Sequence, residues 1–375
     1  MKLPKITKPY HLKDYKFILV ITVISLSVLG VMVVGSANEV YKSRQVVGLG
    51  LGLVAMLVIS LIDYMWIQNF YWLIYFMNIG LLILTLTPLG TTVNGAQRWI
   101  DVGFTNFQPS ELSKICLILF FAKYLMNHEE DLNTVRTIVT SVILIAPNLL
   151  LIVLEPDLST TISIAIVFCV LMYLAGLSYR FIGTMLAILI PAAVIFISIV
   201  VQPNQPFLKE YQQNRILAWL EPEKYASDEA YQQNNAIMAI GSGQLKGKGL
   251  NNNTTTSVKN GNFISEPQTD FIFAIVGEEL GFVGCCIVIG LLLLIVVQCI
   301  LIGMKSQDLS GRIICCGVAA QIGFQSFINI SVATGLFPNT GIPLPFVSYG
   351  LTSLVSMYMG IGFVLNVGLQ PKKYQ

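Results

Sequence analysis

Long apolar stretches recur along the whole of this 375-residue chain, and they restrict its possible folds more than any other feature. A helix that crosses the hydrocarbon core of a bilayer needs about 20 predominantly apolar residues. Suitable segments lie at residues 16–36, 46–62, 65–87, 109–126, 137–154, 159–176, 182–201, 270–303, 312–334 and 348–368. Their apolar residues are continuous and do not alternate with polar ones, which excludes a closed barrel. The sequence therefore predicts an all-α polytopic membrane protein with ten transmembrane helices.

The composition agrees with a membrane protein, because 55% of the residues are hydrophobic and only 11% are charged. Soluble domains average about 25% charged residues. The first apolar stretch follows several lysines and lacks an A-x-A cleavage site, so we interpret it as a retained helix and not a signal peptide. All seven cysteines fall inside apolar segments, where free cysteine packs as a small hydrophobe. The sequence contains no basic run, and we expect no nucleic-acid partner.

The distribution of lysine and arginine predicts the orientation, because these residues are enriched in cytoplasmic loops. With the N-terminus inside, the inner segments contain Lys2, Lys5, Lys8, Lys13, Lys16, Lys123, Arg136, Arg180, Lys305, Arg312, Lys372 and Lys373. Short outer segments then contain only Lys42, Arg44 and Arg98. We therefore predict a single membrane domain, 1–375, in a bacterial cytoplasmic membrane with both termini cytoplasmic. Residues 202–269 form a large extracellular loop within it, and apolar residues recur at helical spacing in 211–220 and 231–243.

Ionisable residues within or beside membrane spans are costly and are candidates for function. In "QPSELSK", Glu111 and Lys114 occupy the first turn of the fourth span, and in "EPDLSTT", Glu155 and Asp157 separate the fifth and sixth spans. Each pair also has a structural explanation. Glu111 and Lys114 are three residues apart and suit an ion pair across one helical turn. Asp157 suits the N-cap of the sixth helix.

Asp270 stands at the mouth of the eighth span, and Glu278 and Glu279 lie two turns further along it. Asp270 suits a helix cap, and the two glutamates suit hydrogen bonds to neighbouring helices. Taken together, the carboxylates predict a polar cavity that faces outward. Its expected cations are Arg98, Lys114, Arg215, Lys246 and Lys248. Such a cavity suits a substrate with an anionic head group and an apolar tail.

Several long segments resemble the SEDS family of shape, elongation, division and sporulation proteins, which RodA and FtsW typify. These segments are "NGAQRWIDVG", "QPSELSK", "EPDLSTT", "EPQTDFIFAIVGEELGFVG" and, most specifically, "FINISVATGLFPNTGIPLPFVSYG". They occur in the family's order and cover nearly all of the chain. The short tails and "NGAQRWI" favour the elongation, RodA-like branch. The sequence departs from common family residues at Ser265, Gln268 and Leu351, where many members have proline, histidine and glycine.

The resemblance implies a ten-helix enzyme that polymerises lipid II into glycan strands at the outer face of the membrane. The family's catalytic aspartate falls on Asp270, its tryptophan on Trp99 beside Arg98, and its acid and lysine on Glu111 and Lys114. We expect Asp270 to act as the general base, because a sugar hydroxyl must lose its proton as the new bond forms. The α-linked donor gives a β-linked product, so a single inverting displacement suffices.

The other site residues follow from the charge of the leaving pyrophosphate, which fixed cations or a divalent metal such as Mg²⁺ or Mn²⁺ would stabilise. Arg98, Lys114, Arg215 and Lys248 are the candidates, with Asp157 and Glu278 as possible supporting residues. Trp99 suits stacking on a sugar or lipid, or a role as an interfacial anchor. No organic cofactor is expected.

The resemblance also implies partners, namely a class B penicillin-binding protein and other membrane proteins of an elongation or division complex. Two alternatives remain. A lipid II flippase would use helices broken near Pro156 and Pro343, although its polar groups should then extend across the membrane. A non-catalytic scaffold would leave Asp270 as a helix cap only.

Overall fold

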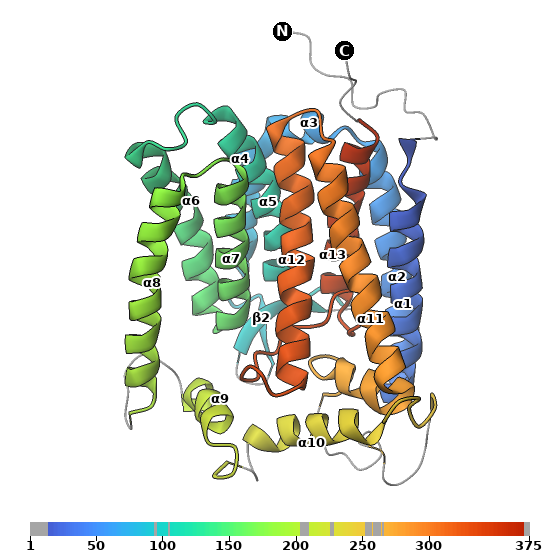
Figure 1. The fold of residues 1–375 in the computed structure, drawn as a ribbon. Coiled ribbons are helices and arrows are strands. Elements are labelled where there is room, and N and C mark those ends of the chain that lie inside the picture. Colours follow the sequence, from blue (N-terminus) through green and yellow to red (C-terminus); the bar gives the residue numbers. More distant parts are fainter. Residues whose placement is uncertain are drawn as a thin grey trace.

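Helices of transmembrane length dominate the fold (Figure 1). The computed structural model describes residues 14–93, 96–103, 106–202, 210–225, 229–251, 257, 264 and 266–370. The first four lysines used for the orientation, Lys372, Lys373 and the departure at Ser265 lie outside these residues. Within the described chain, seven helices are long and apolar enough to cross a membrane. Helices α5, α7 and α8 are the remaining candidates for the ten predicted spans. The seven long apolar helices confirm an all-α polytopic membrane fold.

The bounds of the helices agree with the predicted spans to within several residues. Before the large loop they are α1 (Phe17–Ala37), α2 (Glu39–Leu61), α3 (Tyr64–Ile67) with a 3₁₀ turn and α4 (Tyr71–Thr85), α5 (Pro109–Asn127), α6 (Val135–Leu154), α7 (Leu158–Leu174) and α8 (Tyr179–Val200). After it they are α11 (Ile272–Met304), α12 (Leu309–Ala333) and α13 (Leu351–Gly368). Pro109 occupies the first turn of α5, as its fixed φ favours.

The centre of the bundle is formed by α5, α12 and α13, whose buried residues make up much of one hydrophobic core. Helix α13 packs closely on α2 because Gly52 leaves room for a large ring. A Cβ at Gly52 would lie 2.4 Å from the Tyr358 ring. Small residues at such crossings allow helix backbones to approach within a membrane protein. Gly48 likewise faces α13, where a Cβ would be 3.4 Å from Leu354 Cδ2, whereas a Cβ at Gly50 would meet open space.

A small antiparallel sheet follows α4, and the sequence analysis did not predict it. It consists of β1 (Gly90–Val93), β2 (Ala96–Asp101) and β3 (Asn106–Phe107), in the order β1-β2-β3. Thr91 pairs with Trp99, and Ile100 pairs with Phe107. Strands this short give little alternation in sequence, so the segment resembled a loop. The sheet lies near the end of α7 that is remote from α3 (Figure 1).

Helix α11 is broken, which corrects the prediction of one continuous eighth span. Gly281 has φ 65° and ψ −164°, so Ile272–Leu280 and the rest of α11 are separate helical segments. The preceding loop satisfies the backbone groups that the break exposes. Phe282 N donates to Gln244 O at 2.8 Å, and Lys248 N donates to Glu278 O at 2.9 Å. Glu278 and Glu279 precede the break, so they lie in the short first segment with Ile272 and not in the long part of α11.

Two helices occupy the predicted helical parts of the large loop, α9 (Glu210–Leu220) and α10 (Glu229–Ser242). Figure 1 shows α10 lying across the end of the bundle opposite α3. The described ends of the chain meet at the α3 end, where a Cβ at Gly368 would be 3.2 Å from Lys16 Cγ. An even number of spans requires both ends of the chain to lie on one side of the membrane. That this side is the cytoplasmic one stays a prediction.

Candidate active site

Asp270 lies in a turn that immediately precedes α11, at residues 266–271. Hydrogen bonds from two other elements hold this turn. The side chain of Asn329 on α12 donates to Asp270 O at 2.8 Å. In the segment before α13, Ser348 Oγ donates to Thr269 O at 2.6 Å, and Tyr349 N donates to Gln268 O at 2.8 Å. The turn is therefore fixed through its carbonyl oxygens, which leaves the Asp270 carboxyl group to other contacts.

The alternative that Asp270 merely caps the helix is wrong. The N-cap of α11 is Phe271, and no side chain makes a cap hydrogen bond there. The Asp270 carboxyl group instead faces Gly341, where a Cβ would be 3.4 Å from Asp270 Oδ2. Gly341 has φ +71°, a conformation that glycine adopts without strain. A bare backbone thus borders the carboxylate.

The Asp270 carboxyl group has a raised proton affinity. Burial raises its pKa to about 6, and the charges of Glu266 and Asp157 act in the same direction. Arg215 and Arg98 oppose this rise in the pKa. The structure therefore brings three other predicted site residues, Arg98, Arg215 and Asp157, within electrostatic range of Asp270. A carboxylate with a pKa near 6 is ionised at neutral pH and binds a proton better than an ordinary aspartate.

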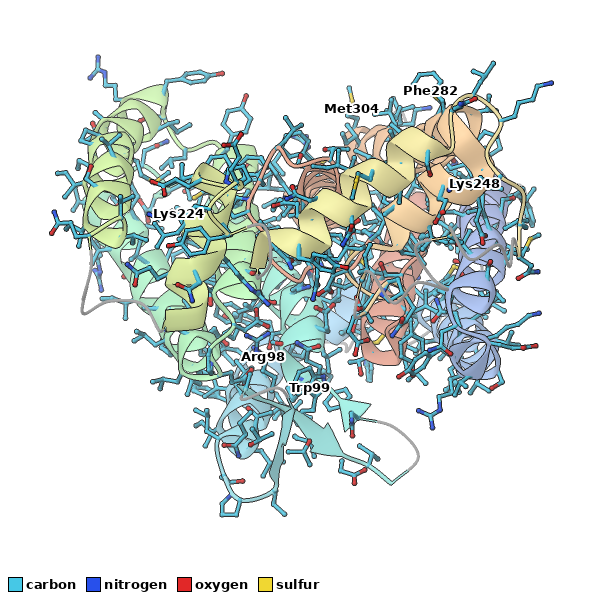
Figure 2. All side chains as sticks on the ribbon, turned by 90° about the horizontal axis from the view of Figure 1, so that it is seen from below. Arg98, Trp99, Lys224, Lys248, Phe282 and Met304 are labelled. Atoms are coloured by element: carbon cyan, nitrogen blue, oxygen red, sulfur yellow. The ribbon has the colours of Figure 1, made fainter. Side chains whose placement is uncertain are left out.

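Strand β2 presents Arg98 to the turn between α6 and α7. The guanidinium donates to the backbone carbonyl of Glu155 at 3.1 Å and to that of Pro156, and it lies 3.9 Å from Asp157 Oδ2. Consecutive strand residues point to opposite faces, so Trp99 extends from the other side of the sheet. Figure 2, a view from below, labels both side chains beside the small sheet. Arg98 and Trp99 therefore present a cation and an aromatic ring to different surroundings.

Asp157 caps α7, as its position in the sequence predicted. Its Oδ1 accepts from Thr160 N at 3.1 Å, and its Oδ2 accepts from Thr160 Oγ1 at 2.9 Å. Its neighbour Glu155 is fully buried and accepts a hydrogen bond from Thr85. Burial raises the pKa of Glu155 to about 7, although Thr85 counteracts part of the rise. The turn therefore combines a structural cap with a second carboxyl group of raised pKa.

Glu111 and Lys114 are both buried in the first turns of α5 and form the predicted ion pair, with Lys114 Nζ 2.6 Å from Glu111 Oε1. Lys114 Nζ also lies 3.4 Å from Gln325 Oε1 on α12, and Gln325 Nε2 donates to Pro343 O at 3.0 Å. Lys114 further borders a mainly apolar cavity between α5, α6 and α7. These contacts are within the protein, and a role in substrate binding stays a prediction for both residues.

Lys248 is paired with Glu278, at 2.8 Å, where the loop after α10 covers the break in α11. Figure 2 shows Lys248 well separated from Arg98. The structure thus brings these two predicted site residues to each other and not to Arg98. Glu279 accepts from Ser36 on α1 and ties the same segment to the first helix.

Sequence reasoning missed three polar residues around Asp270, namely Gln325, Asn329 and Ser348. Their only signal was the polar positions within or beside the segment "FINISVATGLFPNTGIPLPFVSYG". Nothing in the sequence indicated which backbone groups they would contact.

The predicted divalent cation has no cluster of protein ligands in the described part of the chain. No group of three or more histidine, cysteine, aspartate or glutamate residues gathers there in a way that could hold a metal. Mg²⁺ at phosphate-transfer sites often uses only one or two carboxylates together with substrate phosphates. The divalent cation therefore stays a prediction.

Comparison with known proteins agrees with the arrangement of the helices. The model of the FtsW, RodA and SpoVE family, described as cell cycle protein, matches residues 10–373. The probable peptidoglycan glycosyltransferase FtsW of Marinobacter nauticus is 33% identical over 94% of this chain and 89% of its own length. The peptidoglycan glycosyltransferase MrdB of Escherichia coli K12 is 31% identical over 95% of this chain and 93% of its own.

Solved structures show the same fold. One, described as the structural coordination of polymerization and crosslinking by a peptidoglycan synthase complex, has a TM-score of 0.77 and 30% identity over 94% of this chain and 97% of its own. The crystal structure of the rod shape determining protein RodA of Thermus thermophilus has a TM-score of 0.68 and 28% identity over 94% of this chain and 96% of its own. The fold and site therefore define a multi-pass membrane protein of the SEDS type. The chain belongs to the FtsW, RodA and SpoVE family.

Proposed function

We propose that this chain polymerises lipid II into glycan strands at the outer face of the cytoplasmic membrane, with Asp270 as the general base. That the chain is a peptidoglycan glycosyltransferase follows from its family and from relatives of that name. The observation that carries the catalytic proposal is the half-buried, non-capping carboxyl group of Asp270, whose pKa is raised to about 6 although the charges of Arg215 and Arg98 oppose the rise.

The reaction transfers a glycosyl group from a polyprenyl pyrophosphate to a sugar hydroxyl. As the hydroxyl oxygen bonds to the anomeric carbon, the bond from that carbon to the pyrophosphate oxygen breaks on the opposite face, and the configuration inverts. The hydroxyl proton passes to the Asp270 carboxylate. General base catalysis of this kind contributes about 10²- to 10⁴-fold. Pyrophosphate leaves as an anion and needs no proton in the same step.

Fixed positive charge near Asp270 suits the departing pyrophosphate. Arg98 and Arg215 both act electrostatically on Asp270, so an anion near that carboxyl group experiences both guanidinium charges. The contacts of Arg98 with the carbonyls of Glu155 and Pro156 orient its guanidinium before substrate arrives. Charges that are already oriented stabilise a developing anion without reorganisation in the transition state.

The remaining finer assignments also belong to this proposal. The α10 end of the bundle faces outward and both termini face the cytoplasm, in agreement with the lysine and arginine distribution. A class B penicillin-binding protein is the proposed partner, which is in keeping with a similar structure described as a synthase complex. The assignment to elongation and cell shape rests on "NGAQRWI" in the sequence. Depletion in a rod-shaped host should give round cells, and filaments would instead indicate division.

The direct test uses the purified full chain with its cognate penicillin-binding protein and fluorescent lipid II. Glycan strands on a gel should appear with the wild-type pair, and inhibiting the partner's transpeptidase should leave them unchanged. Lipid II that crosses proteoliposome membranes without forming strands would instead support the flippase. Strands that form equally well with the partner alone would support the scaffold. Either result would overturn the proposed activity.

A further inference from the structure

Asn329 is one of the side chains that hold the turn containing Asp270, and it also bonds the segment opposite the Asp270 carboxyl group. Asn329 lies near the end of α12 and is almost completely buried. Its Nδ2 donates to Asp270 O at 2.8 Å and to Ile342 O at 2.7 Å. Because both partners are acceptors, only the amide nitrogen satisfies them, and the orientation of the amide is fixed. Asn329 therefore connects the backbone at Asp270 with the backbone at Ile342.

Ile342 directly follows Gly341, the residue that borders the Asp270 carboxyl group. The same segment is fixed on its other sides. Ser159 at the start of α7 donates to Thr340 O at 2.5 Å, and Gln325 on α12 donates to Pro343 O at 3.0 Å. The 340–343 backbone is thus rigidly placed, and Asn329 transmits that placement to the Asp270 turn.

The cost of this arrangement indicates a specific role. The Oδ1 atom of Asn329 is buried and has no hydrogen-bond partner among the described residues. A buried polar atom without a partner is unfavourable. The same buried amide donates two hydrogen bonds that offset this cost. One ends at the Asp270 turn and the other at Ile342 O, next to Gly341. Misplacement of a reacting group by about 1 Å lowers rates by about 10²-fold.

We propose that Asn329 is a positioning residue that sets the location of the Asp270 carboxylate by tying the Asp270 turn to the 341–342 backbone. This inference rests on the proposed function of Asp270 as the base. Asn329 itself touches no reacting atom. Its loss should therefore lower kcat and leave the affinity for lipid II largely unchanged.

The test compares Asn329→Ala and Asn329→Leu with a matched control, Asn366→Ala. Leucine keeps the approximate volume of the side chain but lacks both donors. Asn366 on α13 is equally buried and also bonds backbone, through Ser60 O and Tyr64 N, but in the α3 region. Its replacement reproduces the general cost of losing a buried asparagine. Activities are referred to folded protein, measured by thermal unfolding and size exclusion.

Both Asn329 variants should lose about 10- to 100-fold in kcat with KM within about threefold of wild type. Asn366→Ala should keep kcat within about twofold per folded molecule. Hydrogen–deuterium exchange should become faster in peptides that cover 266–274 and 339–344 for the Asn329 variants only. These changes together would support the proposal.

Three results would overturn it: a kcat within about threefold of wild type in either Asn329 variant, an equal loss in Asn366→Ala, or unchanged exchange in 266–274. Failure of the proposed function has a different signature, because the wild-type protein with its partner would then make no glycan. In that case the exchange experiment still decides whether Asn329 holds the Asp270 turn.

Discussion

Replacement of Asp270 by asparagine should abolish polymerisation and at the same time stabilise the protein. The substitution keeps the size and shape of the side chain and removes only the ionisable group. Because Asp270 makes no cap hydrogen bond, its replacement loses no helix cap. Glycan synthesis should fall by about 10²-fold or more, since the acceptor hydroxyl loses its base.

The expected gain in stability follows from the pKa of Asp270. Burial raises that pKa to about 6, about two units above the ordinary aspartate value of about 3.9. Each unit corresponds to 1.36 kcal/mol, so the ionised carboxylate lowers the free energy of unfolding by at most about 3 kcal/mol. Asparagine has no charge to bury. We expect the variant to gain about 1–3 kcal/mol at pH 8.

The pH dependence fixes the sign of this effect. The folded protein binds the Asp270 proton more tightly than the unfolded chain does. The free energy of unfolding that this group contributes is therefore highest below about pH 4, falls between about pH 4 and 6, and is level above. The difference in the free energy of unfolding between the Asp270→Asn variant and the wild type should therefore increase between about pH 4 and pH 6. The wild-type kcat/KM should decline as pH falls below about 6, because a protonated carboxyl group accepts no proton.

The assay combines glycan gels with thermal unfolding of detergent-solubilised protein at pH 4.5 and pH 8. Asp101→Asn is the matched control, because Asp101 is exposed at the end of β2 and should change neither quantity. A variant that polymerises at a near wild-type rate would refute the catalytic role of Asp270. An inactive variant whose unfolding temperature at pH 8 does not rise would refute the reasoning from burial.

Three further outcomes are expected. Lys114→Met should lower the free energy of unfolding by about 3–5 kcal/mol, because it leaves the Glu111 charge buried and unpaired. Adding Glu111→Gln to this variant should recover most of the lost stability in thermal unfolding. If polymerisation recovers as well, Lys114 is not part of the substrate site. Arg98→Lys should lower polymerisation by about 10-fold or more on the glycan gel, because a lysine does not reproduce the forked contacts with the 155–156 carbonyls; full activity would mean that the guanidinium is not needed. A cysteine at the exposed Lys224 should react with an impermeant maleimide in intact cells, whereas one at the exposed Glu130 should react only after permeabilisation; the reverse pattern would invert the topology.

The sequence by itself was sufficient for the membrane class, the approximate spans and the position of Asp270 at the start of the eighth span. Runs of about 20 apolar residues have few stable alternatives to a transmembrane helix, because backbone polar groups in lipid must be satisfied internally. The N-cap at Asp157 and the Glu111–Lys114 pair were likewise predictable, because both are contacts between residues three positions apart. Local contacts of this kind are encoded in short segments of sequence.

The tertiary structure decided the contacts between residues far apart in the chain. The break at Gly281 depends on the loop that follows α10, and the pairing of Lys248 with Glu278 depends on the same loop. Asn329 reaches Asp270 across 59 positions of sequence. Neither its partners nor the burial that raises the pKa of Asp270 is visible in local patterns. Both arise only when α12, the Asp270 turn and the 341–342 backbone pack together and exclude water, which makes hydrogen bonds and charges strongly dependent on their neighbours.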